Sequence, residues 1–138
     1  WLWSPHYNQR AIMSFSNTYE TIILNWTFNA SSVTRPTSWY IGLFTSDPGE
    51  GQGGTEVSGN GYARQAATFT VSGNTGTTSN TIEYPASTGA WGTITHIAVY
   101  DAETSGVQIA YAALTTPKTI ATADILRIPA GDIDITLD

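Results

Sequence analysis

The sequence has no cysteine, which excludes disulfide bonds and thiolate metal sites. Charged residues make up 12% of the chain, against roughly 25% in an average globular domain. No apolar run reaches the ~18 residues that a membrane-spanning helix needs, and the N-terminus lacks the charged and apolar segments of a signal peptide. We therefore expect a soluble protein whose stability comes from packing and from self-association.

Basic residues are also few. The chain has five Lys and Arg residues against eleven Asp and Glu residues, which gives a net charge of −6 and a pI near 4.6. Nucleic acids and anionic membranes are bound through basic patches. The basic residues are scattered along the sequence, so we expect neither nucleic acid nor membrane as a partner.

Threonine, serine, asparagine and glycine supply most of the polarity instead. Thr favours strands and Gly favours turns, and 41% of the chain is apolar, which is enough for a hydrophobic core. These features predict one mainly β domain at residues 13–138, an antiparallel β-sandwich or barrel-like fold with one N-terminal α-helix. Turn signals between short apolar segments place the expected strands at residues 39–44, 62–71, 81–84, 93–101, 107–114, 124–128 and 133–137, with a polar loop at 72–80.

A helical pattern begins at Ser14. Ser16 and Asn17 are both good N-caps, and Glu20 completes a capping box with Asn17. We expect a helix at about residues 16–28 that lays an aromatic face on the sheet, because a helix this short needs tertiary contacts. The apolar face consists of Phe15, Tyr19, Ile22, Ile23 and Trp26.

Residues 1–12 are expected to form a separate N-terminal extension. Met13 resembles an ordinary start residue, and the segment before it has neither a helical nor a strand period. Its aromatic side chains, Trp1, Trp3 and Tyr7, are costly to expose to water. They either pack on their own domain or form an arm that lies on a neighbouring subunit.

The stretch from Trp39 to Gln65 joins a buried strand to a second strand through a long loop. The loop between Asp47 and Gly61 is rich in glycine and has no hydrophobic period, and a loop of that length in a compact domain is commonly functional. It leads into a strand and contains no lysine, so it does not resemble a phosphate-binding loop. We expect a surface excursion that contacts a neighbouring subunit or a shell. Its acids could also gather a cation, although the EF-hand pattern is missing: Asp47, Glu50 and Glu56.

No set of residues follows an obvious catalytic or metal-binding pattern. The two histidines, His6 and His96, have no acidic neighbours at metal-ligand spacing, and the Gly-x-Ser-x-Gly motif of serine hydrolases is absent. We therefore predict no enzyme activity, no metal and no cofactor. The acidic face of the C-terminal strand, with Asp132, Asp134 and Asp138 pointing outward, either binds a hard cation such as Ca²⁺ or keeps an edge strand from pairing with other chains.

Aromatic residues are more numerous than a core of this size requires. The excess points to a protein interface, where aromatic side chains are enriched. The alternative is a sugar-binding module in which exposed rings stack on glycans.

The order and spacing of five segments are distinctive: residues 13–17, 39–45, 61–65, 92–101 and 127–132. Together they resemble a family of small virion proteins of tailed bacteriophages. The resemblance extends from about residue 13 to residue 137, and residues 1–12 fall outside it. Members are commonly labelled tail fibre proteins, and related small β-rich proteins decorate the capsid as trimers and cement its major shell protein.

The resemblance implies a non-enzymatic structural protein of the virion, assembled in the host cytoplasm. Because the chain is compact rather than long and repetitive, we expect a trimeric capsid decoration protein that binds the major capsid protein. A tail-fibre or host-glycan-binding module is the alternative, and a glycan hydrolase would need two carboxylates flanking a cleft. The candidate interface residues are Trp1, Trp3, Tyr7, Asp47, Glu50, Glu56, Tyr62, Arg64 and Trp91.

Overall fold

The computed structural model describes residues 11–137, so Trp1, Trp3 and Tyr7 lie outside the described residues. The first strand begins at Ala11, two residues before the expected start of the domain. The elements are β1 (Ala11–Phe15), α1 (Asn17–Phe28), β2 (Trp39–Phe44), β3 (Gln65–Ala67), β4 (Phe69–Ser72), β5 (Thr75–Thr78), β6 (Ile82–Glu83), β7 (Gly92–Tyr100), β8 (Gln108–Ile120), β9 (Arg127–Ile128) and β10 (Ile133–Thr136).

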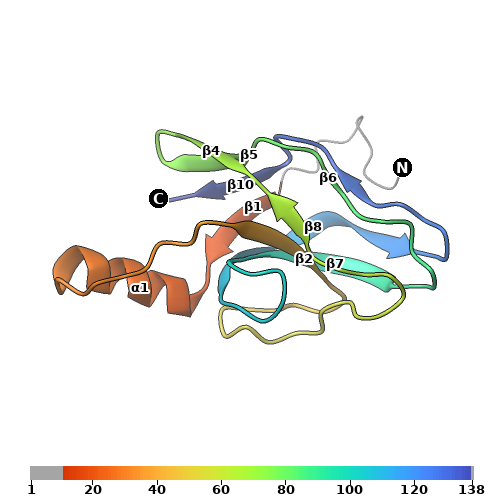
Figure 1. Cartoon of the computed structure of the whole chain (residues 1–138), viewed down its shortest axis with the longest axis horizontal. Coiled ribbons are helices and arrows are strands. Elements are labelled where there is room, and N and C mark those ends of the chain that lie inside the picture. The colour runs from red at the N-terminus through yellow and green to blue at the C-terminus, as the bar shows by residue number, and fades with distance from the viewer. Residues whose placement is uncertain (1–10, 138) are drawn as a thin grey trace.

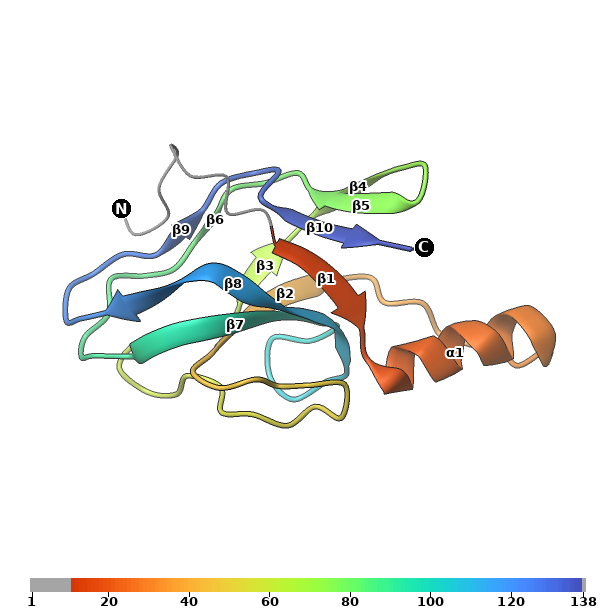
Figure 2. The same cartoon turned by 180° about the vertical axis from the view of Figure 1, so that it is seen from behind.

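Eight of these strands form one sheet that curls into a nearly closed barrel (Figures 1 and 2). The strand order is β3-β2-β7-β8-β1-β10-β5-β4, and β6 pairs with β9 in a separate two-stranded sheet. The two edge strands β3 and β4 are consecutive in the chain, with only Thr68 between them. Trp39 of β2 contacts Phe69 of β4 edge to face, with ring centroids 6.4 Å apart. The prediction of a mainly β, barrel-like domain with an N-terminal helix is confirmed.

Strand β1 connects the two halves of the barrel. Its first three residues pair in parallel with β10, with Ala11 opposite Ile133. Its last two residues pair antiparallel with β8, with Phe15 opposite Ala110. Because β1 passes from one half to the other and then runs directly into the helix, the position of α1 is set by the barrel.

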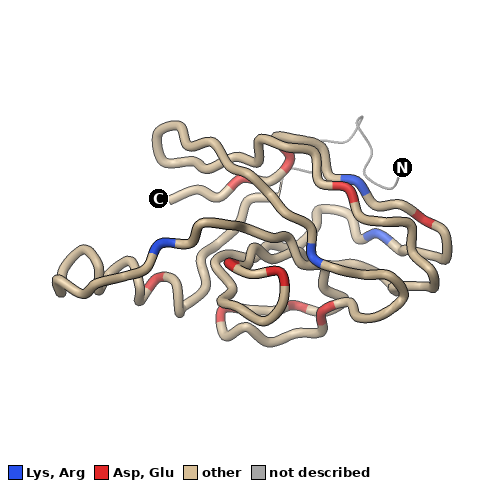
Figure 3. The backbone as a smooth tube through the Cα atoms, viewed as in Figure 1, with Lys and Arg blue, Asp and Glu red and all other residues tan. Residues whose placement is uncertain are grey.

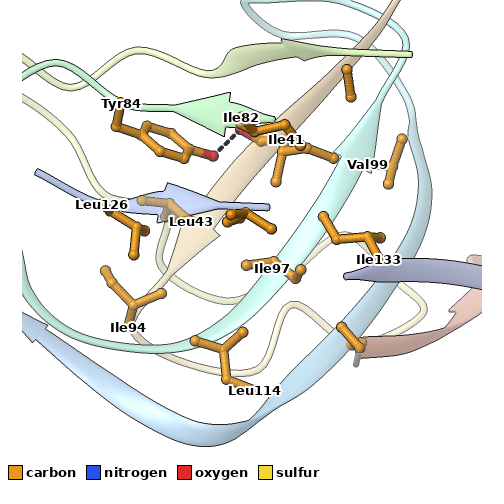
Figure 4. Close-up of a cluster of buried hydrophobic side chains, with 14 of the residues drawn as sticks. Ile41, Leu43, Ile82, Tyr84, Ile94, Ile97, Val99, Leu114, Leu126 and Ile133 are labelled. Carbon is orange, nitrogen blue, oxygen red and sulfur yellow. Dashed lines mark hydrogen bonds between the residues drawn. The ribbon is translucent and has the colours of Figure 1, made fainter. Parts of the chain in front are cut away.

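The core fills the barrel with branched aliphatic side chains (Figure 4). Ile41 and Leu43 from β2 are fully buried, as expected for a strand apolar on both faces. Tyr84 is also buried, and its hydroxyl donates a 2.7 Å hydrogen bond to the Ile41 carbonyl. A buried phenol needs such a partner, so this bond links the segment after β6 to the centre of the sheet.

The expected strand at residues 62–71 is wrong, because the chain turns a corner at Thr68. Its first part, β3, pairs with β2, whereas its second part, β4, pairs with β5. The Thr68 amide donates to the Asn80 side chain, and the Ser79 amide donates to the Thr68 carbonyl, both at 2.8 Å. At the corner, these bonds replace the backbone hydrogen bonds that pair one strand with the next. The apparent alternation therefore runs across two strands that form the two opposite edges of the sheet.

The expected polar loop at residues 72–80 is also wrong, because it contains strand β5. β5 pairs with β4 on one side and with β10 on the other. Ser72 lies opposite Thr75, so only Gly73 and Asn74 form the turn, and Gly73 has a φ of +60°. β5 forms a strand without an apolar alternation, because backbone pairing on both sides holds it in the sheet.

The expectation that Asp134 points outward from an edge strand is wrong. β10 lies between β1 and β5, so it is not an edge. Asp134 is 3% exposed, and its carboxylate accepts a hydrogen bond from the Thr77 hydroxyl of the neighbouring strand. Its role as a guard against edge pairing is therefore excluded, since the strand it stands on is already paired on both sides.

The predicted helix is present, but its expected packing on the sheet is wrong. α1 begins with Ser16 as its N-cap and ends at Phe28, close to the predicted bounds. No residue of α1 is buried, and Trp26 is 66% exposed. Phe15, expected on the helical face, belongs to β1. The helix projects away from one end of the barrel instead of covering its surface (Figures 1 and 2).

Candidate functional site

The base of the projecting helix is fixed by Ser16, which has no exposed surface. Its hydroxyl accepts from the Tyr19 amide at 3.2 Å, as a helix N-cap does, and donates to the Gln108 carbonyl. Its own amide donates to the Ile109 carbonyl at 2.9 Å. Because Ser16 is bonded to β8 on both its backbone and side chain, the helix leaves the barrel in a defined direction.

The Gly-rich loop folds back onto this same base. The Gln108 side chain donates to the Gly49 carbonyl at 2.8 Å, and the Gln108 amide donates to the Gln52 side chain at 3.2 Å. The Asn17 amide donates to the Glu50 carbonyl at 3.3 Å. Gln108 is fully buried, which makes these bonds costly to break. The loop is therefore attached to the subunit through residues 49–52.

The far end of the loop is fixed by an ion pair. Arg64 donates from Nε to Oε1 of Glu56 and from Nη2 to Oε2, each at 2.8 Å. Its Nη1 donates to the carbonyls of Ala102 and Ser105, at 3.0 and 2.7 Å. The guanidinium carbon lies 3.4 Å from the centre of the Tyr100 ring. We call Glu56, Arg64 and Tyr100 the clamp.

The Arg64 guanidinium of the clamp is partly shielded from water. Burial on its own lowers the pKa of the Arg64 guanidinium, and the hydrogen bonds and charge of Glu56 offset this, so the pKa is raised. Gly42 makes room for the pair, because a Cβ at this position would stand 3.0 Å from Oε1 of Glu56 and 3.5 Å from Nε of Arg64. The glycine in the middle of β2 is thus explained by the clamp above it.

Aromatic rings support the clamp from below. The Tyr62 hydroxyl donates to Glu56 at 2.8 Å and accepts from the Leu43 amide at 2.9 Å. The Tyr62 ring stacks on Tyr84 at 6.1 Å and meets Trp91 edge to face at 5.5 Å. Burial, followed by the nearby Glu56 charge, raises the pKa of Tyr62, and burial also raises the pKa of Tyr84. Both phenols therefore remain neutral at physiological pH.

An apolar opening lies where the barrel ends beside the helix. This barrel mouth has a volume of about 280 Å³. Its floor includes the buried Val99 and Ile109, and its rim includes Val71 and Leu137, which are 77% and 52% exposed. The lining residues are Phe15, Tyr19, Trp39, Phe69, Val71, Gly73, Asn74, Gly76, Val99, Ile109, Ile135 and Leu137.

A second apolar hollow, the helix groove, follows one side of α1 and has a volume of about 260 Å³. Tyr19 lines both hollows, so they adjoin at this residue. None of the residues that line the barrel mouth is charged, and Arg35 is the one charged residue in the lining of the groove. Acidic residues gather instead on the loops beside the base of the helix, which are the Gly-rich loop and the turn between β7 and β8 (Figure 3). The groove is lined by Tyr19, Ile22, Ile23, Trp26, Val33 and Arg35.

Among residues 11–137, the polar side chains form no recognisable catalytic or metal centre. Nε2 of His96 lies 3.7 Å from Asp47, beyond hydrogen-bond distance, and its Nδ1 is 2.8 Å from the Thr95 hydroxyl. Within residues 11–137 no group of three or more His, Asp or Glu side chains lies close enough to hold a metal ion. The same residues contain no helix with the length and apolar character needed to cross a membrane.

The structure separates the predicted interface residues into two described groups. Glu56, Tyr62 and Arg64 come together in and beneath the clamp, and Trp91, which is 5% exposed, packs against Tyr62 and donates to the Asn60 carbonyl. These four side chains use most of their surface within the subunit. The remaining two described candidates, Asp47 and Glu50, are exposed on the Gly-rich loop.

Sequence reasoning missed the exposed apolar residues around the helix. Leu24 and Phe28 are 58% and 82% exposed, and neither belongs to the face that was expected to be buried. Their signal was present in the sequence, because Glu20 is the only charged residue of the helix. A helix with so little charge and with apolar residues on two sides is not built to face water.

No curated protein matches the chain. The family model described as Podophage GP4 fiber I protein gp80 matches residues 14–136, which covers the barrel, the helix and all five segments of the resemblance apart from residue 13. The chain therefore belongs to the Podophage GP4 fiber I protein gp80 family, as its resemblance to the small virion proteins of tailed bacteriophages indicated.

Proposed function

We propose that this protein is a structural subunit of a fibre on the virion of a tailed bacteriophage. The observation that carries the proposal is the family match over residues 14–136, since that family is described as a fibre protein of a podophage. The family suggests a virion protein with a structural, non-enzymatic role. What the geometry adds is a rigid module whose long loop is attached at both ends.

A fibre subunit must present surfaces to its neighbours. The described chain has such surfaces at one end, where the barrel mouth, the helix groove and the exposed side of α1 meet. We propose that the protein associates with copies of itself as a homotrimer. Its small fraction of charged residues and its uncovered apolar side chains are in keeping with this.

Capsid decoration is the second candidate. It is favoured by the compact shape of the described domain, which lacks the repeats or coiled coil of a long fibre shaft. In this role the protein would bind the major capsid protein of the assembled shell and stabilise that state by mass action. Both candidates place the protein in the virion, and they differ in its location.

Labelling on intact virions separates the two. Virions that carry this protein would be incubated with a gold-labelled antibody fragment against it and imaged by electron cryomicroscopy. Label confined to the tail region supports the fibre subunit, whereas label spread over the capsid faces supports decoration. The proposal fails in both forms if purified virions contain none of the protein.

A further inference from the structure

One side of α1 has no cover within the subunit. Leu24 and Phe28 are four residues apart, so they lie on the same side of the helix, opposite the groove-lining Ile22, Ile23 and Trp26. Phe28 is 82% exposed, more than any other large apolar side chain of the described residues. A helix of this length gains most of its stability from tertiary packing. The exposed side is therefore expected to be buried in an assembly.

The barrel mouth offers a place for such side chains. Its volume of about 280 Å³ lies just below the roughly 300–1,000 Å³ of pockets that bind small organic ligands. It opens between exposed Val71 and Leu137, over an apolar floor. A cavity of this size fits one or two large apolar side chains better than it fits a separate ligand.

We propose that the end of α1 of one copy of this chain inserts Phe28 and Leu24 into the barrel mouth of a second copy. The inference rests on the proposed self-association and names its contact surface. The two surfaces differ, so the contact is head to tail, and repetition around an axis closes a ring. Each copy then gives its helix to one neighbour and receives a helix from the other.

Charge favours a second copy over a basic partner. The chain carries a net charge of −6, which opposes contact between two copies through most of the surface. The barrel mouth has no charged lining residue, and Glu20, in the first turn of α1, is the only charged residue of the helix. A basic partner would gain nothing at this site. Two copies can therefore meet here through uncharged side chains.

The area explains why the ring should close. Phe28, which is 82% exposed, offers on the order of 150 Å² of ring surface to this contact, since a Phe buries about 150–250 Å². A stable interface buries about 800 Å² on each partner. A single helix-to-mouth contact between two copies falls short of this area. In a ring every copy uses both surfaces, so the closed trimer is expected to form without a stable dimer.

The absence of cysteine allows a direct test by cross-linking. Two single-cysteine chains, Phe28→Cys with a size tag and Val71→Cys without one, would be produced together in one cell and oxidised after purification. We expect a disulfide-linked product of one tagged and one untagged chain. Thr122→Cys replaces Phe28→Cys in the control and should give none of this product, because Thr122 is exposed just after the end of β8, at the end of the barrel away from the helix (Figure 1).

The possible outcomes separate the interface from the self-association. A product that links two Phe28→Cys chains, without the mixed product, means that helices pair with each other, which overturns the insertion. A trimer in analytical ultracentrifugation that gives no cross-link also overturns it, while self-association stands. A monomer under all conditions overturns both, and leaves the location in the virion to the labelling experiment.

A second variant avoids dependence on disulfide geometry. Phe28→Asp places a charge at the proposed point of insertion and should shift the sedimenting species from trimer to monomer, with the far-ultraviolet spectrum of the fold retained. Thr122→Asp adds the same charge at the end of the barrel away from the helix and should leave the trimer intact. If Phe28→Asp remains trimeric, the insertion is disproved.

Discussion

Arg64 holds Glu56 through two parallel hydrogen bonds of 2.8 Å each, although Tyr62 and several loop residues separate them in the chain. The same guanidinium also binds the carbonyls of Ala102 and Ser105. One side chain therefore orders two loops: the Gly-rich loop before β3 and the turn between β7 and β8. A loop without its own secondary structure is defined here by a charged pair near the surface of the barrel.

Breaking this pair should strongly destabilise the protein. The Arg64 side chain is 8% exposed and that of Glu56 is 25% exposed, so removing one partner leaves the other charge poorly solvated. We expect Arg64→Ala to lower the free energy of unfolding by about 3 kcal/mol. Arg64→Lys should recover little of this, because an ammonium group cannot reproduce the paired geometry. Urea unfolding of the variants measures both effects.

The chain contains a matched control for this prediction. Arg127 and Glu83 also form an ion pair, across β6 and β9, but their side chains are 36% and 47% exposed. Surface pairs of this kind contribute about 0–1 kcal/mol. Arg127→Lys should therefore change the free energy of unfolding by less than about 1 kcal/mol. Equal losses of unfolding free energy in Arg64→Lys and Arg127→Lys would show that the clamp stabilises the fold no more than an exposed ion pair does.

Three glycines of the Gly-rich loop test whether that loop is ordered. Gly54 has a φ of +75°, and a Cβ there would stand 2.7 Å from the Asp47 carbonyl oxygen and 2.8 Å from Cα of Pro48. Gly49 has a φ of +58° with nothing within 4 Å, and Gly51 has neither constraint. The left-handed backbone costs an alanine about 1–2 kcal/mol. Gly54→Ala should therefore destabilise most, Gly49→Ala by about 1 kcal/mol, and Gly51→Ala hardly at all.

Thermal melts of the three alanine variants, compared with the unmodified chain, show whether the Gly-rich loop is ordered in solution. A loop that moves freely in solution would accept alanine equally at all three positions. The expected order of melting temperatures is Gly51→Ala highest, then Gly49→Ala, then Gly54→Ala. Identical values would contradict the attachment of residues 49–52 to the base of the helix.

The class of fold and several elements could be predicted from local pattern alone. The strand from Trp39 to Phe44 and the long strand ending at Tyr100 have apolar side chains wherever the core needs them. The helix was predicted from its N-cap and apolar spacing, and Ser16 is indeed the cap. In each case the signal is carried by neighbouring residues, which is the range over which periodicity acts.

What could not be predicted depends on pairing between distant segments. β5 has a Thr- and Gly-rich sequence and is a strand because β4 and β10 pair with it on both sides. The corner at Thr68 depends on the side chain of Asn80. The clamp joins residues that were recognised as notable, but their charges could not reveal that they face each other. The helix was expected on the sheet because its apolar face is visible in the sequence, while the surface that meets that face is not.

Ser16 is predicted to matter for both the helix and its direction. Its hydroxyl caps α1 and also contacts β8 through the Gln108 carbonyl, in a fully buried position. Ser16→Ala should cost about 1–2 kcal/mol of unfolding free energy and reduce helical circular dichroism. Thr27→Ala is the control, because the Thr27 hydroxyl donates to the Ile23 carbonyl at an exposed site, and should cost less than about 0.5 kcal/mol. A Ser16→Ala chain as stable as Thr27→Ala would contradict the role of the cap.

Alkaline pH should destabilise the fold through its buried tyrosines. Burial raises the pKa of Tyr62 and Tyr84 above the value of about 10 found in unfolded chains. Both groups therefore hold their protons more tightly in the folded state, and their contribution to stability is complete below pH ~10 and is lost as the pH rises beyond it. Each such tyrosine should add a loss of about 1.4 kcal/mol per pH unit in this range.

Replacing one of these tyrosines should make the unfolding free energy fall less steeply as the pH rises above ~10. Tyr84→Phe removes the hydrogen bond to the Ile41 carbonyl, so it should cost about 1 kcal/mol at pH 8. Between pH ~10.5 and ~11.5, however, its unfolding free energy should fall by about 1.4 kcal/mol less than that of the unmodified chain, because one ionising group is gone. Urea unfolding at these pH values measures the two slopes. Equal slopes would mean that Tyr84 ionises as readily in the folded barrel as in the unfolded chain, which its burial against Tyr62 and Trp91 opposes.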